Sequence, residues 1–193
     1  MKKCDSLKFG ETIVNKQNLN FIKKMIYNLG IISANIAEVG VYKGGSAMVI
    51  ANAMNKNSKL HLFDTFSGMP EKSIYDNHHN VGDFYDTSYD EILKLFSNYP
   101  NVNIYKGIFP VETGKYVNDI KFDLVHIDVD QYLSHKLSLD FFYNKMNIGG
   151  YIIFDDYNSS YCHGATKAID EFFSDKRENV MDTGENVYFS IKK

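Results

Sequence analysis

Apolar positions along this chain follow two alternating spacings. Between residues 19 and 30 they fall three and four residues apart and end at Gly30, which predicts an amphipathic helix that packs on the rest of the protein. From there, short apolar runs typical of β-strands alternate with helical patterns. We expect strands at 35–40, 59–64, 101–107, 121–128 and 151–156, and helices at 46–54, 88–99, 132–146 and 164–173.

This alternation predicts an α/β fold. Strands separated by helices of this length form a mostly parallel sheet with helices on both faces. After the last helix, residues 179–193 contain two strand-like runs around "TGEN", which indicates a hairpin. The expected sheet therefore has seven strands and finishes with an antiparallel edge strand.

The length of the chain bounds its domain organisation. With 193 residues, of which 44% are hydrophobic, it is long enough for one well-buried domain and short for two. We interpret residues 1–193 as a single domain with a short helical segment at 1–32. The polar stretch 67–87 is the one long irregular piece, and because such loops often cover binding sites we expect a lid there.

Charge and hydropathy argue against two classes of partner. The formal net charge is -3 and lysines are spread along the chain, so no basic patch is expected for nucleic acid. No apolar run approaches the roughly 18 residues of a membrane span. Cys4 and Cys162 are the only cysteines, which suits a reducing compartment. We expect a cytoplasmic protein that binds a small molecule, and the sequence leaves a homo-oligomer open.

The first predicted strand runs into a glycine-rich loop. Open α/β sheets bind ligands beyond the carboxyl ends of their strands, where glycines let the backbone turn tightly and approach a ligand. The spacing differs from the G-x-G-x-x-G of dinucleotide enzymes, and a tight turn without a ligand is the alternative. The loop residues expected beside a ligand are Gly40, Gly44, Gly45 and Ser46.

Acidic residues near this loop indicate which ligand it would take. Glu38, two residues before the first glycine, suits a ligand with an amino group and a positive charge, such as S-adenosylmethionine. Asp64 ends the second strand, where an acid can accept hydrogen bonds from both ribose hydroxyls. Together the two acids favour an adenosyl ligand.

Acid pairs follow two later strands. Asp128 and Asp130 end the strand in "VHIDVDQY", and Asp155 and Asp156 end the strand in "YIIFDDY". Adjacent strand ends bring such carboxylates together, where they repel one another unless a hard cation such as Mg²⁺ binds them. The alternative is that Asp130 caps the helix that follows and that Asp156 is solvated.

Seven segments of the chain, taken in order, resemble the macrocin O-methyltransferase (TylF/MycF-like) family over roughly residues 33–175. They are "EVGVYKGGSA", "LFDTFSGMP", "GDF" at 82–84, "YKGIFPVET", "VHIDVDQY", "GGYIIFDDY" and "GATKAIDEFF". The resemblance implies a Rossmann-like class I methyltransferase fold. It also implies an enzyme that uses S-adenosylmethionine and Mg²⁺ to methylate a hydroxyl of a sugar or glycoside. The metal ligands carried over are Asp128, Asp155 and Asp156, and the general base is Asp130.

The resemblance also implies how the methyl donor is held. The segment from Glu38 to Ser46 would surround its methionine part, and Asp64, followed by Thr65 and Phe66, would hold the ribose. Gly107 and Ile108 would lie near the adenine, although family members often have tryptophan in place of Ile108. Tyr42 and Phe66 are the aromatic residues best placed for the sulfonium, and Asp128 is counted with the donor site as well as the metal site.

Some alternatives stay open at this point. His135 follows Asp130 by about one helical turn, so we count it as a second catalytic candidate ahead of the other histidines. A catechol-type O-methyltransferase has the same fold and also uses Mg²⁺, but its later acid pair is usually Asp-Asn. A D-x-D glycosyltransferase and a binding module without activity are the remaining alternatives. Antibiotic-pathway members carry a longer N-terminal lid, so the acceptor transfers least.

Overall fold

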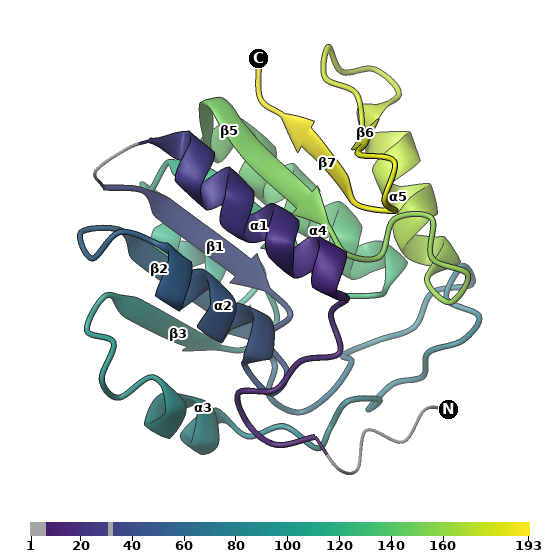
Figure 1. Cartoon of the computed structure of the whole chain (residues 1–193). Helices are drawn as coiled ribbons and strands as arrows, with labels where there is room; N and C mark the ends of the chain where they lie inside the picture. The colour runs from purple at the N-terminus through teal and green to yellow at the C-terminus, as the bar shows by residue number, and fades with distance from the viewer. Residues whose placement is uncertain (1–6, 31–32) are drawn as a thin grey trace.

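A computed structural model of the chain describes residues 7–30 and 33–193. The beginning of the expected N-terminal segment, residues 1–6, and residues 31–32 lie outside the described part. Figure 1 shows one sheet with helices on both sides of it. None of the helices in the described ranges is long and apolar enough to cross a membrane.

The sheet has seven strands in the order β3-β2-β1-β4-β5-β7-β6. The first five strands of this order run parallel, β7 is antiparallel to β5, and β6 pairs antiparallel with β7. The predicted mostly parallel sheet with a final antiparallel hairpin is confirmed, although the short β6 lies outside the antiparallel β7. The strands are β1 (Asn35–Val39), β2 (Lys59–Asp64), β3 (Val102–Lys106), β4 (Phe122–Ile127), β5 (Met146–Phe154), β6 (Met181–Asp182) and β7 (Tyr188–Ile191).

The helices begin and end where the chain supplies local signals. The side chain of Asn15 caps the first helix by accepting a hydrogen bond from the backbone N–H of Asn18 at 2.8 Å, and Gly30 ends it in a left-handed conformation. The predicted helix at 132–146 stops at Phe142, and the next strand begins earlier than expected, at Met146. The helices are α1 (Lys16–Leu29), α2 (Gly45–Ala53), α3 (Tyr89–Leu95), α4 (Tyr132–Phe142) and α5 (His163–Phe173), with 3₁₀ turns η1 (Gly114–Val117) and η2 (Tyr143–Lys145).

Two apolar layers hold the helices to the sheet. Because side chains alternate along a strand, Ile36 of β1 packs in a layer with α1 and α2, whereas Ala37 packs in a layer with α4 and α5. The second layer is rich in phenylalanine, and Phe63 and Phe142 are fully buried in it. Full burial of one such side chain contributes about 1.5–3 kcal/mol. These layers hold the helices against the two faces of the sheet.

The strand order reverses between β1 and β4. From β1 the chain builds outward through β2 to β3, and from β4 it builds in the other direction through β5. Ligands in open α/β sheets bind beyond the carboxyl ends of the strands at this point of reversal. The glycine loop after β1 and the acid pairs after β4 and β5 therefore meet at one edge of the sheet.

Candidate active site

A cavity of about 1180 Å³ lies at this edge of the sheet. It is lined by the glycine loop, by the ends of β2, β4 and β5, by the residues that follow β3, by part of the 67–87 segment and by residues 11–15 before α1. Most of the predicted site residues line it: Gly40, Tyr42, Gly45, Ser46, Asp64, Thr65, Gly107, Ile108, Asp128, Asp130, Asp155 and Asp156.

The glycine loop has no room for side chains at two positions. Gly40 has φ +88°, and a Cβ atom there would lie 1.7 Å from the carbonyl oxygen of Asp128. A Cβ atom on Gly45 would lie 2.3 Å from the carbonyl carbon of Glu11. The loop therefore fits closely between the end of β4 and the N-terminal segment.

Asp64 closes the glycine loop onto the end of β2. Its Oδ2 accepts hydrogen bonds from the backbone N–H groups of Val41 and Tyr42, each at 2.8 Å, and its Oδ1 accepts one from the N–H of Phe66 at 2.7 Å. A carboxylate has about four acceptor positions, so little capacity is left for two ribose hydroxyls. The ribose role of Asp64 stays a prediction, and its role in shaping the loop is clear.

Three predicted donor-site residues do not line the cavity. Gly44 lies behind the loop, where it precedes α2 with φ +82°. Phe66 is buried in the apolar layer of α1 and α2, and its ring packs beside Tyr89. Glu38 lies beside His126 of the neighbouring strand, with its Oε1 2.9 Å from Nδ1 of that histidine, and both side chains are fully buried. The local sequence pattern does not show this partner, because it lies on the neighbouring strand β4.

The contact with Glu38 raises the pKa of the buried His126. Burial lowers the pKa of His126, but the hydrogen bond and the charge of Glu38 outweigh it and hold the pKa above the usual value of a histidine. Because Glu38 does not line the cavity, it can affect a bound ligand only by holding β1 beside β4.

Three carboxylates converge at the ends of β4 and β5, as predicted. Asp128, Asp155 and Asp156 each present one oxygen, and these oxygens lie within 4.8 Å of one another. Burial and the charges of the other two raise the pKa of Asp128 well above its ordinary value, and burial raises that of Asp155. A set of oxygen donors in this arrangement fits a hard divalent cation such as Mg²⁺.

Hydrogen bonds from neighbouring residues hold two of the carboxylates in place. Asp156 Oδ2 accepts hydrogen bonds from the backbone N–H of Val129 at 3.1 Å and from that of Asp130 at 2.8 Å. Asn18, from α1, is fully buried and donates a side-chain hydrogen bond to Asp155. The apolar spacing of α1 predicted only that it would pack, so its contribution to the site was missed.

His135 does not reach the cavity. It is fully buried in the first turn of α4, its Nδ1 lies 3.1 Å from the carbonyl oxygen of Gln131, and its Nε2 lies 3.6 Å from Asp156 Oδ2. Burial lowers the pKa of His135. The catalytic role of His135 therefore stays a prediction. Because its Nε2 lies beside Asp156, we expect any effect of His135 on the reaction to act through that carboxylate.

The 67–87 segment is tied to α4 by a residue that local patterns miss. Asp76 is buried, its Oδ1 accepts from the backbone N–H of Tyr132 at 2.9 Å, and its Oδ2 accepts from the N–H and Oγ–H of Ser73. Asp76 therefore caps α4 from 56 residues upstream. The alternative that Asp130 caps this helix is wrong. The residue at the N-cap position is Gln131, and its side chain makes no capping hydrogen bond.

The sequence profile of the family described as macrocin-O-methyltransferase (TylF) matches residues 2–183. The chain belongs to this family. It is therefore an O-methyltransferase, and the glycosyltransferase and the inactive binding module that the sequence had left open are set aside. No match was found among curated proteins.

Solved structures share the fold of this family member. The O-methyltransferase NovP has a TM-score of 0.78 at 21% identity, with 95% of this chain and 82% of that chain covered. The calicheamicin methyltransferase CalS11 has a TM-score of 0.77 at 18% identity, with 93% and 80% covered. An O-methyltransferase from Bacillus cereus in complex with SAH has a TM-score of 0.64 at 14% identity, with 93% and 82% covered. These likenesses confirm the expected class I methyltransferase fold.

Proposed function

We propose that this methyltransferase moves the methyl group of S-adenosylmethionine to a hydroxyl of a sugar or glycoside, with Mg²⁺ at the carboxylates of Asp128, Asp155 and Asp156. The observation that carries the proposal is the convergence of these carboxylates beside the glycine loop in a single cavity. CalS11 is a TDP-rhamnose 3'-O-methyltransferase, which supports a sugar acceptor, and the SAH bound to the Bacillus cereus enzyme supports this donor.

The donor would lie along the glycine loop. Its sulfonium carries a positive charge, which the face of Tyr42 and the nearby carboxylates would attract. Thr65, Gly107 and Ile108 line the same cavity and would border the adenosyl part. Ile108 is partly exposed, and an aliphatic side chain there would cover one face of the adenine.

The acceptor hydroxyl would lie between the donor and Asp130. Burial, and next the charge of Asp156, raise the pKa of Asp130 well above its ordinary value, which makes it a stronger base once ionised. When bound, Mg²⁺ would supply Lewis-acid stabilisation of the oxygen that loses its proton. Asp130 would accept that proton.

The size of the cavity suits two ligands. Its volume of about 1180 Å³ exceeds the roughly 300–1,000 Å³ of pockets that hold one small molecule. Tyr85 and Tyr161 line it and are 75% and 64% exposed. Their rings would offer flat apolar surfaces to a sugar ring or its aglycone.

The donor site is tested by calorimetric titration of S-adenosylmethionine into the full chain, with Mg²⁺ and with chelator. We expect wild-type binding and at least a roughly 100-fold weaker affinity in Asp64→Ala, because the glycine loop that Asp64 holds through the N–H groups of Val41 and Tyr42 would open. Asp175→Ala is the control, since Asp175 is exposed and pairs with its neighbour Lys176. Circular dichroism checks that both variants are folded. If the wild type binds S-adenosylmethionine neither with Mg²⁺ nor with chelator, the proposed donor is wrong.

The acceptor is tested with labelled S-adenosylmethionine and a panel of glycosides and catechols. We expect Mg²⁺-dependent transfer to glycosides, with activity lost on chelation, because the three carboxylates need a cation beside the acceptor hydroxyl. Transfer to catechols alone would replace the sugar acceptor with the catechol type. Equal rates with Mg²⁺ and with chelator would overturn the metal requirement.

A further inference from the structure

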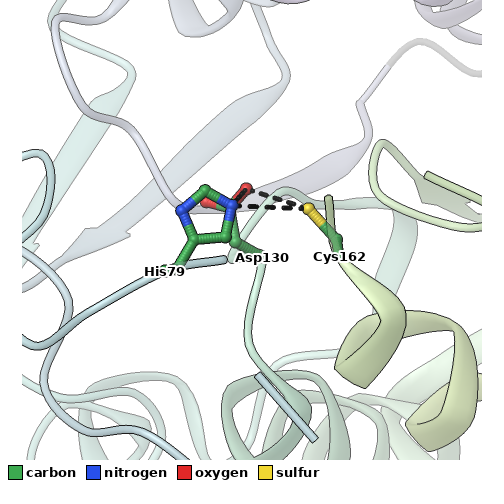
Figure 2. Close-up of side chains that lie close together, drawn as sticks. All are labelled: His79, Asp130 and Cys162. Atoms are coloured by element: carbon green, nitrogen blue, oxygen red, sulfur yellow. Dashed lines mark hydrogen bonds and ion pairs between the residues drawn. The ribbon is translucent and has the colours of Figure 1, made fainter. Parts of the chain in front are cut away.

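A second group of possible metal ligands lies beside the carboxylates. Figure 2 shows His79, Asp130 and Cys162 pointing toward one another from three different parts of the chain. Cys162 Sγ lies 3.3 Å from Asp130 Oδ1, His79 Nε2 lies 3.5 Å from the same oxygen, and Sγ and Nε2 are 3.7 Å apart. The three atoms therefore form a nearly equilateral triangle.

This triangle has the dimensions of one face of a tetrahedral zinc site. Zinc binds sulfur at about 2.3 Å and nitrogen or oxygen at about 2.0–2.2 Å, so in a tetrahedral site sulfur lies about 3.5–3.7 Å from a nitrogen or oxygen ligand, and nitrogen lies about 3.3–3.6 Å from oxygen. The distances from His79 Nε2 to Cys162 Sγ, 3.7 Å, and to Asp130 Oδ1, 3.5 Å, agree with these values. The distance of 3.3 Å between Sγ and Oδ1 is shorter by about 0.2 Å, so a bound ion would move these two atoms slightly apart. We propose that His79, Asp130 and Cys162 form a binding site for Zn²⁺ or another borderline-soft transition metal, separate from the site of Asp128, Asp155 and Asp156.

The chemistry of the two groups separates their metals. Thiolate and imidazole ligands favour zinc and its neighbours, whereas carboxylates alone favour Mg²⁺. The two sites are adjacent, because the backbone N–H of Asp130 donates to Asp156 at 2.8 Å. Each site thus selects its own ion although both lie in one cavity.

The surroundings of the group agree with metal binding. His79, Asp130 and Cys162 all line the cavity, which leaves a fourth position for water or a cavity ligand. The second ring nitrogen of His79 lies 3.9 Å from a carboxylate oxygen of Asp83. A carboxylate near the other nitrogen is common for histidines that bind metal. Without metal, the thiol of Cys162 donates a hydrogen bond to Asp130, and the ion would take the place of that proton.

Occupation of the site has a mechanical and a chemical consequence. His79 belongs to the 67–87 segment, Asp130 follows β4, and Cys162 is the cap residue of α5. A bound ion would clamp the segment over the strand ends. On the further assumption of the proposed function, it would also occupy the base Asp130, so zinc would inhibit methyl transfer reversibly.

The site is tested with Co²⁺, whose bond to a thiolate gives a charge-transfer absorption band. Co²⁺ is titrated into the full chain in the presence of excess Mg²⁺. We expect one equivalent of Co²⁺ to produce the band, and we expect the band to disappear when Zn²⁺ displaces the Co²⁺. Cys162→Ser should abolish the band, and His79→Ala should weaken Co²⁺ binding by at least about 10-fold. Cys4→Ser is the matched control, because Cys4 is the other thiol of the sequence, and it should keep the band.

The readout uses no methyl donor, so failure of this site is distinguishable from failure of the proposed function. A band that persists in Cys162→Ser, a band lost in Cys4→Ser, or no band in wild type would overturn the site. Because His79 lies in an irregular segment outside the core, His79→Ala tests the site without disturbing the fold. Undiminished Co²⁺ affinity in that variant would likewise overturn it. Asp128→Asn, which changes only the other site, should keep the band.

Discussion

Asp128→Asn should abolish Mg²⁺ binding and yet make the metal-free protein more stable. The substitution removes one of three converging ligands, so Mg²⁺ affinity should fall by more than about 100-fold. It also removes a buried negative charge that two neighbouring carboxylates repel. Thermal unfolding with chelator should show a rise in Tm of about 2–4 °C for each kcal/mol of repulsion relieved.

The pH dependence of the metal-free protein follows from the same repulsion. The pKa of Asp128 is raised in the folded state, while the unfolded chain has an ordinary aspartate pKa near 3.9. Folding therefore favours the protonated carboxyl, and this contribution to stability is present below about pH 3.9 and is lost as the pH rises through the folded pKa. The advantage of Asp128→Asn over wild type should grow over that window, and saturating Mg²⁺ should remove it.

Asp123→Asn is the matched control on the same strand. Asp123 lies at the opposite end of β4, where its carboxylate accepts hydrogen bonds from the N–H of Asn35 at 2.9 Å and from the side chain of Asn147 at 2.7 Å. Its replacement should lower Tm and leave Mg²⁺ binding unchanged. A lower Tm for Asp128→Asn in chelator, or unaltered Mg²⁺ affinity in that variant, would contradict the account of the carboxylate site.

Gly40→Ala should destabilise the protein by more than about 4 kcal/mol. The added Cβ would lie 1.7 Å from the carbonyl oxygen of Asp128, and φ is +88° at this position. Since β1 and β4 are paired and packed in the core, the clash cannot be relieved without moving a strand. We expect Tm to fall by about 10 °C or more, or no folded protein at all.

The control separates the clash from the backbone conformation. Gly149 of β5 has φ +82°, and a Cβ atom added there would meet no atom of the described residues within 4 Å. Gly149→Ala should therefore cost only the left-handed conformation, about 1–2 kcal/mol. Equal losses in the two alanine variants would show that the close approach to Asp128 is unimportant.

Local patterns in the chain determine which elements can be predicted from the sequence. Strand β2 was predicted with its observed limits because a short apolar run is flanked by polar residues. The meeting of Asp128, Asp155 and Asp156 was predicted because parallel neighbouring strands end at one edge of a sheet. The end of α4 and the start of β5 were misplaced, since Gly149 and Gly150 interrupt the strand pattern and indicate a turn.

The sequence by itself determined the order of the elements, the α/β class and the carboxylate cluster. Hydrophobic periodicity and the position of a residue at the end of a strand are local properties, and a regular parallel sheet places neighbouring strand ends side by side. Only the tertiary structure decided that Asp76 caps α4 and that Asn18 supports Asp155. It also buried His135 beside Asp156 and brought His79 and Cys162 to Asp130. Asp76 and His79 lie in the irregular 67–87 segment, and Asn18 lies on a helix from the other end of the chain. Their contacts depend on long-range packing and not on any repeating pattern in the chain.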